Sequence, residues 1–231
     1  MSRGYGQFCG LARALELLGG RWALLVVRDL LSGAKRFTEL QEGLPGIPTN
    51  VLTARLRELE DAGVVQRRVQ PRPGGGVVYE LTDYGRELEQ PLLSLGFWGA
   101  KALGPSEEGD FVSMTALALA MRGAFRPRAA RGPQRLYELK VDGKSLRIEV
   151  KRGKVTVPAS SSDDPDAVLE AGADVFLDLL AGNADLDDVA TSGRLRLDGD
   201  RAEARHFFEM FRLPSSHDAD ETPQRARAGT A

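Results

Sequence analysis

The sequence predicts an α+β fold that is divided into two domains. Apolar side chains recur at helical spacing through residues 8–62, and after Gly63 the pattern changes to β-branched and aromatic runs. Beyond residues 104–109, whose composition is typical of a linker, a helix, alternating strands and further helices follow. A chain of 231 residues suits one or two domains. We predict a first domain at 1–104, a linker at 105–110, a second domain at 111–213 and a disordered polar tail at 214–231.

Four helices are predicted before Gly63. Residues 8–20 form the first helix, which ends at a pair of glycines, and residues 21–34 form a second helix that is apolar on most sides. A short third helix covers 36–44, and the PGIP turn leads to a fourth helix at 49–62. The side chains of the second helix that we expect in the core are Trp22, Leu25, Val26 and Leu30.

The helix at 49–62 combines a narrow apolar stripe with a polar edge. Leu56 and Leu59 fall within about 40° of Leu52 on a helical wheel, so these three leucines face the core. Three of the four residues on the opposite side carry hydrogen-bonding groups of the kind that read base edges in a major groove. These four are Asn50, Thr53, Ala54 and Arg57. The alternative interpretation is an ordinary solvated helix face.

Two strand-like runs, VVQRRV and VVYEL, follow this helix and are separated by QPRPGGG. The prolines and glycines predict a flexible hairpin tip, and the three glycines, which precede no helix, are unlike a phosphate-binding loop. A two-stranded flap beside the fourth helix is a wing. The first domain is therefore predicted to be a winged helix-turn-helix.

A long apolar helix is predicted at 83–103, with Thr82 as its N-cap and a break or kink near Pro91. Its apolar positions are Leu88, Leu92, Leu95 and Trp98. Because this helix is too apolar to stand alone in water, we expect it to pack with the first helix of a second subunit.

The second domain begins with an apolar helix at 111–125. Three alternating runs then turn at Asp142-Gly143 and Arg152-Gly153, which predicts consecutive antiparallel hairpins. A short strand, a helix, a last strand and a closing helix complete the α+β pattern.

Composition and charge restrict the function. The chain has 31 Lys+Arg against 33 Asp+Glu, so it has no global nucleic-acid signature. Residues 65–79, however, contain Arg67, Arg68 and Arg72 without a carboxylate, and any anion-facing surface is expected there. Cys9 is the only cysteine, which excludes an internal disulfide and favours a reducing compartment. With no apolar run long enough to span a bilayer and no signal-peptide pattern, the expected protein is soluble, cytoplasmic and free of membrane contact.

No catalytic constellation is evident. The two histidines, His206 and His217, lie on a predicted helix and in the predicted tail, so no His-based triad or metal cluster is expected. We predict neither an enzyme nor a bound cofactor or metal.

Five blocks of the first half carry a resemblance to a known family. GGRWALLVVRDLLSG, RFTEL, NVLTARLRELEDAGVVQRR, YELTDYGREL and FWG occur in the order and at the spacing of HxlR-type winged helix-turn-helix transcriptional regulators. The similarity covers about residues 8–104. It implies a homodimer that binds double-stranded DNA and dimerises through its terminal helices. One departure is Pro48, which stands where that family usually has a capping serine; we expect Thr49 to supply a capping oxygen instead.

Within this fold, the polar edge of the fourth helix is expected to read bases, and the arginines of the wing and of the third helix to contact phosphates. The predicted DNA contacts are Arg36, Thr49, Asn50, Thr53, Arg55, Arg57, Arg67, Arg68 and Arg72. Some of these arginines are expected to form salt bridges instead. Several members of the family use an N-terminal cysteine as a redox or electrophile sensor, which makes Cys9 a candidate; the alternative is a small buried side chain at the dimer interface.

The second half resembles the sterol-carrier-protein-type domain over about residues 111–213, from YELKVDGKSLRIEVKRGKVTV to GRLRLDGDRAEARHFFEMF. This resemblance implies a five-stranded sheet whose helices cover an apolar tunnel for a hydrophobic small molecule. The residues expected nearest the tunnel are Met114, Leu117, Met121, Phe125, Phe176, Leu180, Phe207, Met210 and Phe211. At helical spacing the same residues can simply fill a core.

The predicted function is a homodimeric, DNA-binding transcriptional regulator, most simply a repressor, whose second domain binds a hydrophobic effector or serves in dimerisation. The alternative from another class is a lipid or small-molecule carrier that retains a vestigial helix-turn-helix.

Overall fold

The computed structural model describes residues 4–71, 75–103, 111–158 and 163–213. The predicted linker, the predicted tail and Arg72 lie outside the described residues. The chain divides into two compact units, Met1–Ala120 and Met121–Ala231, and each is described by itself. The division falls within helix α7 (Met114–Ala124).

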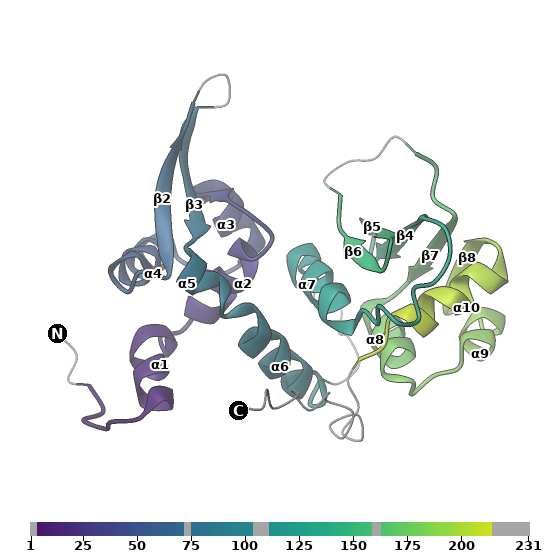
Figure 1. Cartoon of the computed structure of the whole chain (residues 1–231), viewed down its shortest axis with the longest axis horizontal. Coiled ribbons are helices and arrows are strands. Elements are labelled where there is room, and N and C mark those ends of the chain that lie inside the picture. Colours follow the sequence, from purple (N-terminus) through teal and green to yellow (C-terminus); the bar gives the residue numbers. More distant parts are fainter. Residues whose placement is uncertain (1–3, 72–74, 104–110, 159–162, 214–231) are drawn as a thin grey trace, which may run out of the picture. The chain divides into compact units, whose positions relative to one another are not determined.

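The first unit contains the four predicted helices in the predicted order (Figure 1). Their bounds are α1 Gly10–Leu18, α2 Ala23–Leu30, α3 Phe37–Gly43 and α4 Thr49–Asp61. The second helix starts later than predicted because Trp22 adopts a left-handed conformation, with φ of 77°, which a helix cannot include.

The core of the first unit is built mainly from α2, α3, α4 and the base of the wing, and Leu18 of α1 packs partly buried against it. Its buried side chains are Val26, Val27, Leu30, Leu40, Leu44, Ile47, Leu52, Leu56, Leu59, Val64, Val65 and Leu81. Val26 and Leu30 are buried as predicted, and Trp22 packs partly against this core. The expectation for Leu25 is wrong, since this side chain is 40% exposed on the outer side of α2.

The wing consists of β2 (Val65–Gln70) and β3 (Gly76–Leu81), which pair antiparallel beside α4 (Figure 1). A third strand that the sequence did not predict, β1 (Lys35–Arg36), adds to the outer side of β3. The two inner residues Val65 and Leu81 face each other in the register and are buried, so the base of the wing is part of the core.

The predicted break after the wing is confirmed. Thr82 Oγ1 accepts a hydrogen bond from the Gly85 N–H at 3.0 Å and caps the short helix α5 (Asp83–Arg86). The chain then restarts as α6 (Glu89–Ala100). Pro91 lies in the first turn of α6, because a proline has no N–H for the bond that would continue α5 and its ring would clash with the preceding turn.

Within the described residues, the second unit forms a five-stranded sheet in the order β6-β5-β4-β7-β8. The strands are β4 Arg135–Val141, β5 Lys144–Lys151, β6 Lys154–Thr156, β7 Ala167–Ala171 and β8 Leu195–Gly199. The helices after α7 are α8 Ala173–Ala181, α9 Leu186–Thr191 and α10 Arg201–Met210. Both predicted hairpins are present, and the four turn residues Asp142, Gly143, Arg152 and Gly153 all have positive φ. The α+β fold class is confirmed.

The two faces of this sheet differ. Tyr137, Leu139 and Ile148 alternate with polar neighbours and are fully buried on one face, where the ring of Tyr137 meets that of Phe207 from α10 at 5.0 Å. The opposite face is charged, and Arg147 and Glu138 form an ion pair there at 3.1 Å. The sheet is mixed, since β4 and β7 pair parallel and the other neighbours pair antiparallel, and it has one apolar face packed against a helix and one polar face.

Candidate nucleic-acid interface

The edge of α4 that faces away from the core is polar. Leu52, Leu56 and Leu59 are at most 1% exposed, which fixes the rotation of the helix. Asn50 and Arg57 are consequently exposed and Thr53 is half-buried. In the described part of the chain Arg57 has no ion-pair partner, so its guanidinium is available to a ligand.

The start of α4 is held by a contact between helices. Pro48 is the N-cap and accepts no side-chain hydrogen bond. Thr49 does not cap the helix as expected, because its hydroxyl oxygen accepts a hydrogen bond from Gln41 Nε2 of α3 at 2.8 Å. The Thr53 hydroxyl donates to the Thr49 carbonyl, also at 2.8 Å. Gln41 therefore fixes the entry to α4, while the Thr49 hydroxyl keeps its own proton for donation.

Arg55 lies apart from the other predicted contacts. It forms an ion pair with Glu58 at 2.5 Å, and its side chain is 24% exposed. Its guanidinium packs against Gly20, and its Nε is buried without a hydrogen-bond partner among the described residues. The helical wheel indicates this difference. Arg55 is about 60° from Leu52, next to the apolar stripe, whereas Arg57 is about 140° away and points to solvent.

The wing presents Arg67 and Arg68 on opposite faces. The Arg67 guanidinium lies over the ring of Tyr79, 5.8 Å from its centroid. Arg68 donates two hydrogen bonds to the Glu80 carboxylate, at 3.1 and 3.0 Å. These bonds lower the pKa of Glu80 and raise that of Arg68. Among the described residues, Arg67 is thus oriented by stacking on Tyr79, whereas Arg68 is oriented and partly neutralised by a carboxylate.

Arg36 joins the same surface through the strand that the sequence did not reveal. The register places Arg36 beside Val78, on the face of the wing that carries Arg68. Arg36 Nη2 donates to the Gly75 carbonyl at 3.3 Å, near the tip of the hairpin. A two-residue strand has no periodicity, so its only sequence signal was the Lys35-Arg36 pair in front of a helix.

Cys9 occupies the N-cap position of α1 and is exposed. The backbone N–H groups of Ala12, and then Leu11, lower the pKa of its thiol, since they stabilise the thiolate. Large apolar side chains are exposed around it and on α6. They are Tyr5, Phe8, Leu11 and Leu15 near Cys9 in the sequence, Leu95 and Trp98 on α6, and Leu103 just after α6.

The predicted ligand-binding residues of the second half lie mainly inside its core. Met121, Phe176, Leu180, Phe207, Met210 and Phe211 are each at most 2% exposed. Phe207 and Phe211 stack at 4.5 Å, and Phe125 meets Phe211 at 5.3 Å. Phe125 is half-buried, as are Met114 and Leu117 near the start of α7. The structure therefore brings Phe125, Phe207 and Phe211 together as one packed cluster.

The described residues contain neither a membrane-spanning helix nor a cluster of metal ligands. Over these ranges no helix has the length and apolar character needed to cross a membrane. No group of three or more His, Cys, Asp and Glu side chains within them is arranged to hold a metal ion.

Comparisons with known proteins agree with this geometry. Residues 17–107 match the HxlR-like helix-turn-helix family, and residues 117–212 match the SCP-2 sterol transfer family. The HTH-type transcriptional regulator YdeP of Bacillus subtilis (strain 168) is 39% identical over 93 residues, which cover 40% of this chain and 73% of YdeP. YodB, an HTH-type transcriptional regulator of the same strain, is 36% identical over 94 residues, 41% of this chain and 84% of YodB.

Among solved structures, the reduced form of YodB from B. subtilis has 34% sequence identity and a TM-score of 0.38; the match covers 44% of this chain and all of that one. The identity over most of the length of the curated relatives, together with the helix-turn-helix and its wing, identifies the chain: it belongs to the HxlR-like helix-turn-helix family of DNA-binding transcriptional regulators, with an SCP-2-type domain in its second half.

Proposed function

We propose that this protein regulates transcription as a homodimer that inserts α4 of each subunit into the major groove at two half-sites about one DNA turn apart. The observation that carries the proposal is the exposed polar edge of α4 beside a wing with an exposed, stacked arginine. At 13 residues, α4 is about 20 Å long, which suits a major groove.

The contacts divide into two kinds. Asn50, Thr53 and Arg57 read base edges, with Thr49 at the start of the helix donating to a base or a phosphate. Arg36, Arg67, Arg68 and Arg72 contact phosphates, where charge matters more than shape. Arg55 has a supporting role, because its guanidinium is already paired and packed.

Dimerisation uses the apolar side chains exposed on α1 and α6. Phe8, Leu11 and Trp98 are each more than two-thirds exposed, an exposure that is costly for aromatic and aliphatic side chains in water. A second copy of the chain would remove them from water. Cys9 lies at the start of α1, so covalent modification of its thiol would alter this same interface.

The second domain supplies a hydrophobic effector site. Its match to a sterol transfer family supports an apolar ligand, enclosed by the residues around Phe207 and Phe211. An effector that binds one dimer arrangement better than the other shifts DNA affinity by the ratio of its two affinities, and by no more.

Gel-shift titration with a duplex selected from a random pool tests the DNA contacts. Arg67→Ala with Arg68→Ala should weaken binding to all sequences and flatten the salt dependence by roughly 0.9 per lost phosphate contact. Arg57→Ala should instead reduce the preference for the selected duplex over a scrambled one. Arg196→Ala, an exposed arginine of β8, is the control for charge. If affinity, salt slope and preference all remain unchanged, the assignment of this surface is wrong.

The SCP-2 match also favours a second candidate function, a carrier of lipids or small molecules with a vestigial helix-turn-helix. Native mass spectrometry of the purified protein separates the two functions. A carrier copurifies with its ligand and shows no preferred duplex, whereas the regulator selects one.

A further inference from the structure

The second unit carries a cluster of basic side chains that the proposed function does not use. The cluster comes from two segments, the loop after α7 and the turn between β5 and β6. Its members are Arg128, Arg131, Lys151, Arg152 and Lys154, and we call it the basic end of the sheet. All five side chains are exposed.

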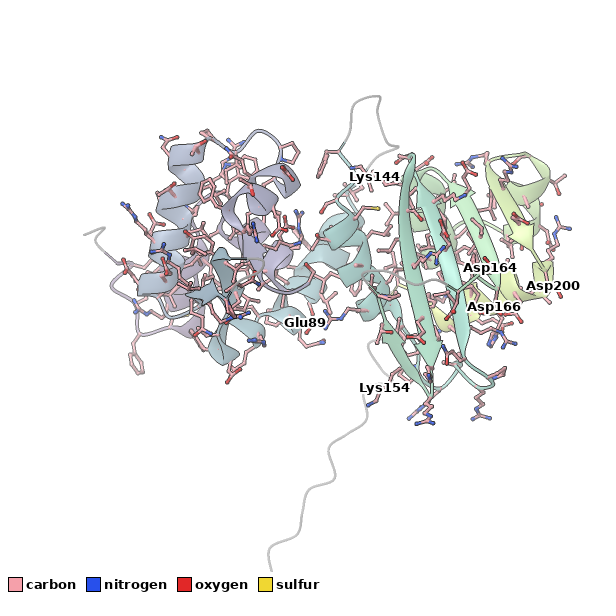
Figure 2. All side chains as sticks on the ribbon, turned by 90° about the horizontal axis from the view of Figure 1, so that it is seen from above. Glu89, Lys144, Lys154, Asp164, Asp166 and Asp200 are labelled. Carbon is pink, nitrogen blue, oxygen red and sulfur yellow. The ribbon has the colours of Figure 1, made fainter. Side chains whose placement is uncertain are left out.

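Sheet geometry brings these residues together. Lys151 and Lys154 are directly opposite each other in the pairing of β5 with β6, and the turn between them is Arg152-Gly153. A Cβ on Gly153 would lie 4.0 Å from the Pro127 carbonyl oxygen, so the loop with Arg128 runs against this turn. Figure 2 shows Lys154 and Lys144 near opposite ends of the sheet, as expected from the register. The turn with Lys151, Arg152 and Lys154 and the start of the loop that carries Arg128 and Arg131 therefore lie side by side in the second unit.

Within the residues that the structure describes, no carboxylate is paired with the basic end. Over the described ranges, none of its five cations forms an ion pair. Glu149, the carboxylate two residues before Lys151, accepts hydrogen bonds from Gln134 at 2.5 Å and from Thr156 at 3.2 Å. Like charges directly opposite each other on paired strands destabilise a hairpin, so Lys151 and Lys154 repel unless an anion lies between them.

Two features indicate the kind of anion. The cations extend over two segments and are all exposed, which suits a chain of phosphates better than a single small anion held in a pocket. No large apolar side chain is strongly exposed in the described part of residues 121–213, so this unit lacks the apolar wedge that anchors amphipathic surfaces in a bilayer.

We propose that the basic end binds backbone phosphates of the same duplex that α4 reads. This inference rests on DNA binding by the first unit, because only a bound duplex keeps phosphates near the second unit. Covalent linkage then raises the local phosphate concentration, so that a weak contact adds to the affinity without adding sequence preference. The second unit accordingly extends the DNA-binding surface of the protein.

A pair of double variants tests the proposal in the full-length protein. Lys151→Gln with Lys154→Gln removes two charges from the basic end, and Lys140→Gln with Arg196→Gln removes two exposed charges from elsewhere on the same sheet. Affinity for the selected duplex is measured at several salt concentrations. The first variant should bind about five- to twentyfold more weakly near 0.15 M salt, with a salt slope lower by roughly 1.8, which corresponds to two phosphate contacts. Its preference for the selected over the scrambled duplex should be retained.

Equal DNA affinity and equal salt slope in the two double variants would overturn the proposal. If Arg57→Ala still reduces the preference for the selected duplex over the scrambled one, the proposed function would stand. Absence of any duplex binding by the unaltered protein would overturn both. Binding to vesicles of phosphatidylserine and phosphatidylcholine is measured in parallel. If the basic-end variant loses vesicle binding but keeps its DNA affinity, the surface belongs to a membrane and the proposal is wrong.

Discussion

Arg55 lies across Gly20 so closely that a Cβ on Gly20 would overlap its Nη1 atom. Gly20 belongs to the turn between α1 and α2, and Arg55 belongs to α4. This packing, with the Arg55–Glu58 ion pair, connects the segment that begins at Cys9 to the helix proposed to read DNA. The turn that follows α1 is therefore in direct contact with a side chain of α4.

Two glycine-to-alanine substitutions compare a contact with a flexible side chain and a contact with the backbone. At Gly20 an alanine meets the flexible end of Arg55, which can move aside, so we expect Gly20→Ala to cost about 1 kcal/mol or less. At Gly85 an alanine meets the Val64 carbonyl oxygen of the backbone, and we expect a cost of about 3 kcal/mol. Urea denaturation of both variants measures the difference. Equal losses would mean that Arg55 is held rigidly at Gly20.

Removing the carboxylate that holds Arg68 should strengthen DNA binding. Glu80→Gln releases Arg68 and eliminates a negative charge from the wing, so affinity should rise a few-fold for all sequences and the salt dependence should steepen. Glu87→Gln, an equal charge change at an exposed site beyond the wing, is the control. Salt titrations of both variants test this. A loss of affinity in Glu80→Gln would show instead that Glu80 positions Arg68 for its phosphate.

The period of the leucines was sufficient to predict α4 and its polar edge, because burial of Leu52, Leu56 and Leu59 leaves only one rotation of the helix. The same logic failed at Leu25, where an all-round apolar helix does not specify which side faces the core. The short strand β1 could not be predicted for another reason. The strand Lys35–Arg36 is stabilised by pairing with β3, a tertiary contact with no local signature.

Helix α9 was not predicted either, although its sequence contains a clear helix-capping residue. Asp185 caps this six-residue helix by accepting from the backbone N–H groups of Asp187 and Asp188, at 2.8 and 3.2 Å. The basic end could not be predicted from the sequence, because its two segments, around Arg128 and Lys151, come together only in the folded protein.

The thiol of Cys9 should ionise at lower pH than an ordinary cysteine. Its pKa is lowered by the backbone N–H groups of Ala12 and Leu11, which favour the thiolate. Since Cys9 is the only cysteine, the rate of iodoacetamide alkylation as a function of pH reports this group directly. The folded protein should show a lower midpoint than the protein in denaturant. Coincident midpoints would remove the argument for an activated thiol.

The contribution of Asp29 to the free energy of unfolding changes with pH in the direction opposite to that of most carboxylates. This side chain is 1% exposed, Arg28 Nη2 contacts its Oδ1 at 2.8 Å, and Gly43 leaves room for its Oδ2. Burial raises the pKa of the Asp29 carboxyl, an effect that Arg28 and Lys35 only partly oppose. A carboxyl whose pKa is higher in the folded than in the unfolded protein binds protons preferentially when folded. Its contribution to stability therefore rises as the pH falls through the folded pKa toward the unfolded value of about 4.

Other carboxylates act in the opposite direction, so the contribution of Asp29 must be isolated by difference. The pKa values of Glu80 and Glu203 are lowered by their arginine partners, and these groups lose stabilising interactions as the pH falls. We expect the stability of the unaltered protein minus that of Asp29→Asn to increase steadily from pH 7 toward pH 4. Urea denaturation of both proteins at matched pH and salt measures this difference. A difference that is flat, or that decreases toward acid, would mean that Arg28 stabilises the Asp29 carboxylate by more than burial destabilises it.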